Sequence, residues 1–126
     1  MTIPEEIEIA VSYFNENYNT KISVAQYAES LHISTNWFIR NFKQHMKMSP
    51  AQYLLSLRMV NAQSLLENTD YSVGEIAEIV GYDNQLYFSR VFKKEYGISP
   101  AQYRKRAENQ SAAPMESDVG EITRED

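Results

Sequence analysis

Apolar residues recur along this chain at the three- and four-residue spacing of amphipathic helices. The first such segment contains Ile7, Ala10, Val11 and Phe14. Two later segments share one arrangement of four apolar positions, which are Val24, Tyr27, Ala28 and Leu31 in one and Val73, Ile76, Ala77 and Val80 in the other. A longer apolar pattern runs through residues 51–67. These patterns predict an all-α protein.

An internal repeat divides the chain into two copies. The pentapeptide Ser-Pro-Ala-Gln-Tyr occurs at 49–53 and again at 99–103. The same offset of 50 relates Phe38 to Phe88 and Arg40 to Arg90, whereas upstream residues are related by an offset of 49. The second copy therefore has one extra residue, near Asp83. A repeat of this length indicates a duplicated supersecondary unit.

Capping residues predict that each copy is a helix, a short turn and a second helix. Capping boxes are predicted at Ser23 with Gln26 and at Ser72 with Glu75, and Ser34 and Asn84 are suitable N-caps for the following helices. Gly81 stands where a positive φ is needed after the first helix of the second copy, and His32 occupies the equivalent place in the first copy. The first copy is therefore expected to have the more strained turn.

The complete fold prediction is two helix-turn-helix subdomains joined by a long connecting helix, with about seven helices in all. The first module covers about 5–48 and the second about 72–106, within one domain spanning 1–106. The connecting helix, about 50–67, has Ser-Pro at its start and spans roughly 27 Å. Residues 107–126 are polar and acidic, which predicts a disordered tail.

The second helix of each copy is predicted to present polar side chains outward. Phe38 and Phe42 lie on one face, and Arg40, two positions from each, points to the opposite face. Arg90 stands in the same relation to Phe88 and Phe92. Arginine can bind guanine, asparagine or glutamine can bind adenine, and an apolar side chain can contact the thymine methyl group. The duplicated arrangement predicts DNA recognition in a major groove.

Charge permits this function without establishing it. The formal net charge is −5, which is the wrong overall sign for a nucleic-acid-binding protein. Residues 21–106, however, contain eleven basic and seven acidic residues, because most of the acidic excess lies in the two ends of the chain. The predicted DNA-binding core therefore has a net charge of +4.

Other classes of function find little support in the sequence. There are no cysteines, which excludes disulfides and thiolate zinc sites, and the two histidines, His32 and His45, are not at metal-ligand spacing. No nucleophile and base pair or phosphate-binding loop is present, so we predict neither an enzyme nor a cofactor. An apolar stretch approaching ~20 residues is also lacking, so we predict a soluble protein that is neither membrane-bound nor exported.

The second copy resembles the motif of the AraC/XylS family of bacterial transcription regulators. The resemblance rests on the stretch from Ile76-Ala77 through Gly81-Tyr82 and Phe88-Ser89-Arg90 to Gly97-Ile98-Ser99-Pro100. It extends over roughly 7–106 and includes Arg58, Ala62 and Leu65-Leu66. It implies two recognition helices in successive major grooves on one face of DNA, in a bacterial transcription activator of the cytoplasm and nucleoid that works with RNA polymerase. Successive grooves on one face lie about 34 Å apart, a separation that the connecting helix can hold.

Residues of the predicted DNA-binding site follow from this resemblance together with the outward faces. The base-reading candidates are Asn36, Ile39, Arg40, Gln85, Ser89 and Arg90, and the further contacts are Thr35, Lys43, Asn84 and Lys93. Two first-copy positions, His32 and Lys47, depart from the family, which usually has glycine at the latter, and an irregular helix end is expected there.

Four questions stay open at this stage. Trp37 and Tyr87 suit packing, phosphate contact or base contact, and Arg58 suits either bracing or phosphate contact. Most relatives carry a ligand-sensing or dimerisation domain ahead of such a unit, so the sequence is interpreted as a fragment, with a short stand-alone regulator as the alternative. A helical protein-interaction module without sequence-specific DNA binding is the alternative from a different functional class.

Overall fold

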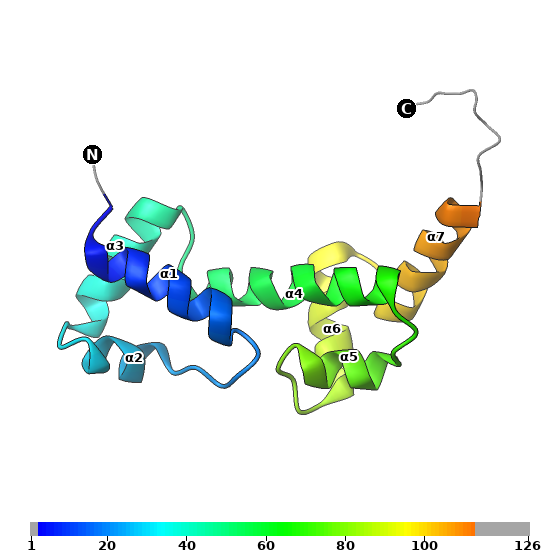
Figure 1. Ribbon diagram of the computed structural model, residues 1–126, viewed down its shortest axis with the longest axis horizontal. Coiled ribbons are helices and arrows are strands. Elements are labelled where there is room, and N and C mark those ends of the chain that lie inside the picture. Colours follow the sequence, from blue (N-terminus) through cyan, green and yellow to red (C-terminus); the bar gives the residue numbers. More distant parts are fainter. Residues whose placement is uncertain (1–2, 113–126) are drawn as a thin grey trace, which may run out of the picture.

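The computed structural model describes residues 3–112, and within them the chain forms seven helices and no strand (Figure 1). The helices are α1 (Glu5–Asn17), α2 (Val24–Ser30), α3 (Thr35–Met46), α4 (Pro50–Asn68), α5 (Val73–Ile79), α6 (Gln85–Tyr96) and α7 (Pro100–Ala112). The predicted all-α fold is confirmed. None of the helices in this part of the chain has the length and apolar character needed to cross a membrane.

Helix α4 runs along the long axis and joins a module at each end (Figure 1). The first module packs α1, α2, α3 and the start of α4 around a cluster centred on Phe14, Phe38 and Phe42. The second module packs the rest of α4 with α5, α6 and α7 around a cluster that includes Phe88 and Phe92. Each phenylalanine of these two centres is fully buried. The apolar faces predicted from helical spacing therefore form two cores rather than one.

The helix starts agree with the predicted caps, with one exception. Ser34 and Asn84 accept hydrogen bonds from the backbone of Trp37 and Tyr87, at 3.0 and 2.9 Å. The capping box at Ser72 is complete, but at Ser23 only the serine half forms, since the Gln26 side chain does not return to the cap. The negatively charged Glu75 carboxylate is also attracted by the helix dipole, an interaction that the neutral Gln26 side chain lacks.

The repeated pentapeptide starts two helices in the same way. Ser49 and Gln52 form a complete capping box at the start of α4. Ser99 and Gln102 make the same reciprocal hydrogen bonds, at 3.0 and 3.1 Å, at the start of α7. The glutamine of Ser-Pro-Ala-Gln-Tyr therefore has a structural role that the sequence interpretation did not assign.

The helix ends show where the first copy departs from the second. His32 and Lys47 have φ angles of 61° and 67°, and Gly81 and Gly97 have 105° and 83° at the equivalent places. The expectation of a more strained turn in the first copy is confirmed, because side chains other than glycine are disfavoured in this region. The expectation of an irregular helix end at Lys47 is wrong. Its amide donates to the Lys43 carbonyl at 2.9 Å, as the Gly97 amide does to Lys93 at 2.7 Å.

Replacing Lys47 with glycine is expected to stabilise the protein by about 0.5–1 kcal/mol, because relief of the left-handed strain outweighs the entropy that glycine gains on unfolding. Urea denaturation measures the change in the free energy of unfolding. Gly97→Lys, the reciprocal substitution in the second copy, should destabilise by a similar amount. A loss of stability in Lys47→Gly would show that the lysine side chain contributes more at this position than its backbone strain costs.

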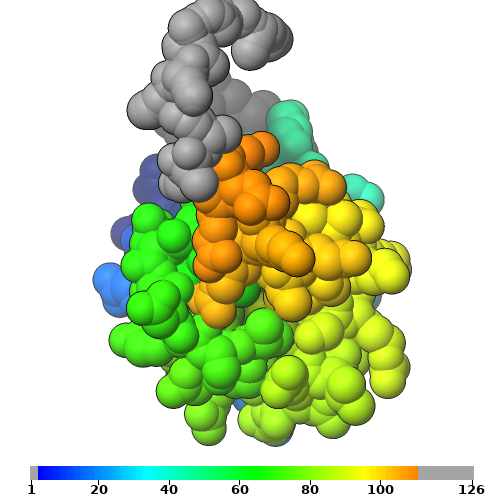
Figure 2. Space-filling view, turned by 90° about the vertical axis from the view of Figure 1, so that its right-hand side faces the viewer, coloured from blue at the N-terminus to red at the C-terminus, as the bar shows by residue number. Residues whose placement is uncertain are grey.

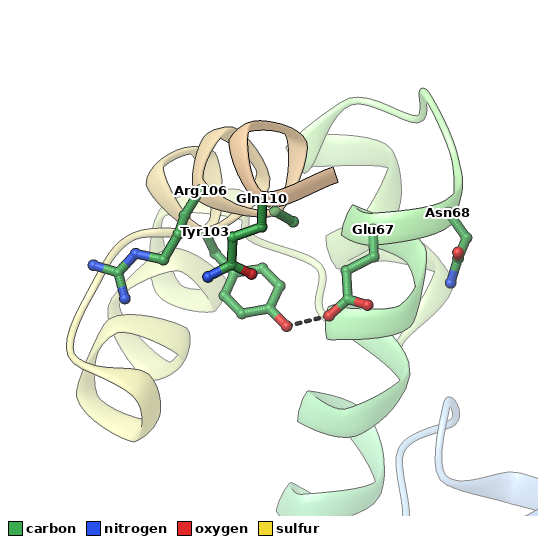
Figure 3. Close-up of a pocket in the computed structure, with 6 residues that line it drawn as sticks. Glu67, Asn68, Tyr103, Arg106 and Gln110 are labelled. Atoms are coloured by element: carbon green, nitrogen blue, oxygen red, sulfur yellow. Dashed lines mark hydrogen bonds between the residues drawn. The ribbon is translucent and has the colours of Figure 1, made fainter. Parts of the chain in front are cut away.

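Two tyrosines of the repeated pentapeptide tie the last helix of each module to its first. The Tyr53 hydroxyl donates to Asn15 of α1 at 3.3 Å, and the Tyr103 hydroxyl donates to the Glu67 carboxylate of α4 (Figure 3). The hydrogen bond to Glu67 raises the pKa of Tyr103 to about 12. Both tyrosines therefore have a structural role.

Helix α7 continues further than the sequence predicted. It lies across the end of the molecule beside α4 and α6 (Figure 2) and reaches Ala112. The prediction of disorder is thus wrong for residues 107–112. Ala107, Glu108 and Gln110 are good helix formers. Ala107 is also half-buried, near Glu67 and Asn68. The rest of that prediction, 113–126, lies outside the described residues.

Candidate nucleic-acid interface

Buried phenylalanines fix the orientation of α3 and α6. The ring centres of Phe38 and Phe42 lie 5.7 Å apart on the inner face of α3. Those of Phe88 and Phe92 lie 6.0 Å apart on the inner face of α6. All four side chains are fully buried, so rotation of either helix about its axis would expose apolar surface to water. The opposite faces of both helices are therefore held toward the solvent.

The predicted arginines stand on these outer faces. Arg40 and Arg90 are exposed, and neither side chain takes part in a hydrogen bond, ion pair or cation–π contact with another residue of 3–112. An exposed guanidinium without an internal partner keeps its five N–H donors available for a ligand. Hydrogen bonds or ion pairs between these guanidinium groups and the rest of the protein would have argued against a recognition role, and none is observed in this part of the chain.

The remaining predicted site residues differ in how accessible they are. Most of them are exposed: Asn36, Ile39, Lys43, Asn84, Gln85 and Lys93. Thr35, the first residue of α3, and Ser89 on α6 are half-buried. The structure therefore brings all ten predicted residues onto or beside the outer faces of the two helices.

Two of these residues have local structural roles as well. The Asn84 side-chain oxygen caps α6 by accepting from the Tyr87 amide, which leaves its NH₂ group and the second lone pair of the oxygen for another partner. Gln85 lies against α5, where its Oε1 is 2.8 Å from the position that a Cβ on Gly74 would take. Gly74 thus provides the space that Gln85 occupies, and a larger residue there would displace it.

The structure distinguishes two aromatic residues that the sequence left ambiguous. Trp37 is half-buried and packs against the first core, which favours the packing interpretation. Tyr87 is 55% exposed at the start of α6 and therefore remains available to a ligand, although its ring also lies 5.8 Å from that of Tyr82.

Leu86 is the residue that the predicted site set lacked. It is 69% exposed, the highest value among the large hydrophobic residues described. Leu86 lies one helical turn before Arg90, on the same face of α6. An exposed leucine at that position suits apolar contact with a base edge.

The charges on the two helices are mostly positive. Lys43 lies in the last turn of α3, and Lys93 and Lys94 lie in the last turn of α6. Helix α3 contains no acidic residue and α6 contains one, Glu95. The outer surfaces of both helices therefore favour a polyanion despite the negative net charge of the whole chain.

Helix α3 lies beyond the start of α4, and α6 lies behind the second half of α4 (Figure 1). Because α4 has 19 residues, its axis is about 28 Å long. This length is close to the separation of successive major grooves on one face of B-DNA, about 34 Å. Among residues 3–112 there is no group of three or more histidine, cysteine or acidic side chains placed to hold a metal ion.

Comparison with known protein families places most of the chain in one of them. Residues 27–106 match the family model described as a helix-turn-helix domain. The raffinose operon transcriptional regulatory protein RafR of Pediococcus pentosaceus is 38% identical over 101 residues. That alignment covers 80% of this chain and 36% of RafR. The chain thus spans just over a third of the length of this curated relative.

Solved structures support the same relationship. The C-terminal domain of AraT, a response regulator from Geobacillus stearothermophilus, is 32% identical and superposes with a TM-score of 0.80, covering 98% of this chain and 97% of that domain. The DNA-binding domain of the global transcriptional factor AdpA, solved in complex with a target DNA, is 28% identical with a TM-score of 0.80. This second match covers 88% of the chain and the whole of the AdpA domain. The predicted fold class is therefore confirmed by experimental structures.

Proposed function

This chain belongs to the AraC/XylS-type family of helix-turn-helix domains, and from that membership we propose that it binds double-stranded DNA sequence-specifically and regulates transcription. The observation that carries the proposal is the duplicated outer face. Arg40 and Arg90 stand at equivalent exposed positions, each opposite a pair of fully buried phenylalanines and each on a helix with a side-chain N-cap. The complex of the related AdpA domain with its target DNA supports the same function.

Each side chain has a role that its chemistry suits. Arg40 and Arg90 bind guanine through two parallel hydrogen bonds, and Asn36 and Gln85 bind adenine. Ile39 and Leu86 contact thymine methyl groups, while Ser89 donates to a base edge or a phosphate. The phosphate contacts are made by Lys43 and Lys93, together with Thr35 and Asn84 at the starts of the two helices.

Two further parts of the proposal concern the complete protein. RafR and the other regulators that this chain resembles are longer than the chain. We therefore propose that such a DNA-binding unit works together with an effector-binding or dimerisation domain. We also propose that the protein acts in the bacterial cytoplasm as an activator that contacts RNA polymerase.

Selection of duplexes from a randomised pool tests the proposal directly. We expect enrichment of a sequence with two short conserved elements separated by about one helical turn, because α3 and α6 each read one major groove. For the selected duplex, log K should fall with log[salt] with a slope of about −0.9 for each phosphate neutralised.

A protein-interaction module would behave differently in the selection. It would enrich no sequence, and any binding to DNA would be equal for all duplexes. Failure to enrich a sequence at low salt would therefore contradict the proposed function.

A further inference from the structure

We propose that a lateral joint between the two modules, held by Arg58, sets the spacing and relative rotation at which the two recognition helices meet DNA. This inference rests on the proposed DNA-binding function. The joint is formed by the α1–α2 loop of the first module, the α5–α6 turn of the second and one side chain of α4. Its members are Tyr18, Asn19, Thr20, Lys21, Arg58, Gly81, Tyr82 and Asp83.

Arg58 connects both modules from the middle of α4. Its Nε donates to the Tyr18 carbonyl at 2.8 Å, and one terminal nitrogen donates to the Thr20 carbonyl at 2.9 Å. The carbon at the centre of its guanidinium group also lies 5.2 Å from the centre of the Tyr82 ring, within the range of a cation–π interaction. One side chain therefore holds the loop of the first module against the turn of the second. Of the two roles left open for Arg58, the structure shows bracing.

The loop and the turn also touch each other directly. A Cβ on Gly81 would lie 3.1 Å from backbone atoms of Asn19, so the two backbones approach as closely as glycine allows. Tyr18 packs against the apolar clusters of both modules. On the surface, Lys21 Nζ lies 2.8 Å from a carboxylate oxygen of Asp83. That ion pair is highly exposed, so it adds orientation more than stability.

The one-residue difference in length between the two copies falls at this contact. The equivalent residues Ile33 and Tyr82 donate to Ala28 and Ala77, and Ser34 caps the next helix immediately afterwards. In the second copy Asp83 intervenes before the cap, Asn84. The extra residue that the repeat offset placed near Asp83 is therefore Asp83 itself, and its carboxylate pairs with the first module. The turn of the first copy is shorter by one residue and makes no such contact among the interactions described.

The joint connects the two modules at a second point besides α4, and this limits how far α4 can bend or twist. A single helix fixes the distance between its ends, but bending and twisting of that helix would change the angle between α3 and α6. A contact displaced from the helix axis resists both motions. In bivalent binding, the affinity gained by linking two modules depends on how well their geometry matches the two sites. The joint should therefore determine which half-site spacing is preferred.

Arg58→Met tests this role, and Arg104→Met is the matched control. Arg104 makes the same pair of hydrogen bonds to backbone carbonyls, those of Leu66 and Thr69 at 3.1 Å, but within the second module alone. Both methionine variants keep an unbranched side chain of similar length. Arg58→Met and Arg104→Met thus remove equivalent pairs of hydrogen bonds, one pair at the joint and one away from it, and Arg58→Met also removes the cation–π contact with Tyr82.

The first readout is binding to duplexes whose selected half-sites are moved apart or together by one base pair. Each such step shifts the second site by about 3.4 Å and rotates it by about a tenth of a turn. We expect the wild-type protein and Arg104→Met to lose at least about tenfold in affinity, and Arg58→Met to lose about threefold or less, because a loosened joint adapts to both spacings. Affinity for an isolated half-site should be equal for the wild type and Arg58→Met.

The second readout needs no DNA. Because the chain has no cysteine, spin labels can be placed at Gln44→Cys on α3 and Glu95→Cys on α6, both exposed, and the distribution of label distances measured. Arg58→Met should broaden this distribution, whereas Arg104→Met should leave it unchanged. Asp83→Asn, an exposed substitution that leaves the core intact, should broaden the distribution less. If Arg58→Met does not fold, Asp83→Asn alone tests the joint.

The outcomes separate this proposal from the proposed function. If the label distances in both Arg58→Met and Asp83→Asn are distributed as in the wild type, the proposed joint is contradicted. It is also contradicted if a folded Arg58→Met loses as much affinity as the wild type when the half-site spacing changes. If the wild-type protein prefers no duplex, the proposed function fails, while the distance measurement still determines whether the joint holds the modules.

Discussion

Replacing Arg90 with alanine is expected to weaken binding to the selected DNA sequence by about 1–3 kcal/mol. Arg90 is exposed and lies opposite Phe88 and Phe92, and its side chain makes no hydrogen bond, ion pair or cation–π contact within residues 3–112. The loss should therefore appear in binding and not in folding. Because a bidentate contact distinguishes guanine from the other bases, the variant should also accept any base at one position of the site.

Lys93→Ala provides the control for this prediction. Lys93 lies in the last turn of the same helix and is proposed to bind phosphate, which carries no sequence information. Its loss should weaken binding to all duplexes alike and reduce the slope of log K against log[salt] by about 1. Anisotropy titrations with selected and random duplexes measure both effects. Equal losses on the two duplexes for Arg90→Ala would contradict the assigned role.

Phe92→Ala is expected to lower the free energy of unfolding by about 3–5 kcal/mol. The Phe92 side chain is fully buried, and its ring lies 6.0, 4.7 and 5.6 Å from those of Phe88, Tyr96 and Tyr103. Removing it leaves a cavity among α6, α7 and the rest of the second core. A domain of this size has only about 5–15 kcal/mol of stability, so the substitution threatens the second module as a whole.

Leu86→Ala is the matched control for stability. Leu86 lies on the same helix and is also apolar, but it is 69% exposed, so its loss should change the free energy of unfolding by less than about 0.5 kcal/mol. Urea denaturation of the three proteins, followed by circular dichroism, measures the difference. A Phe92→Ala variant as stable as Leu86→Ala would show that the second core is not organised around the phenylalanines. Leu86→Ala should still weaken DNA binding if the leucine contacts a base.

Interactions between near neighbours explain why much of this protein could be predicted. A cap depends on a residue and the amide three positions later, and Ser34, Ser72 and Asn84 form the predicted bonds. An apolar face depends on residues three and four apart, and the phenylalanines of α3 and α6 are buried as the spacing indicated. The outward direction of Arg40 and Arg90 follows from the same arithmetic, because a residue two positions from a buried one lies nearly opposite to it.

Local rules were also the source of the errors. An irregular end of α3 was expected at Lys47 because the family usually has glycine there, yet the helix ends as regularly as at Gly97. The packing of α3 against α1 and α4 outweighs a local strain of about 1 kcal/mol. In the same way, the composition of residues 107–112 indicated disorder, whereas α7 lies beside α4 and continues to Ala112.

The sequence alone determined the two modules, their repeat, the helix starts and the faces that α3 and α6 turn toward solvent. Only the tertiary structure decided that Arg58 binds the α1–α2 loop and Tyr82, that Tyr18 is shared by two cores, and that Asp83 pairs with Lys21. The physical reason is range. Caps and helical faces arise within a few residues, whereas the contacts of the joint join segments far apart in sequence and exist only because α4 brings the two modules side by side.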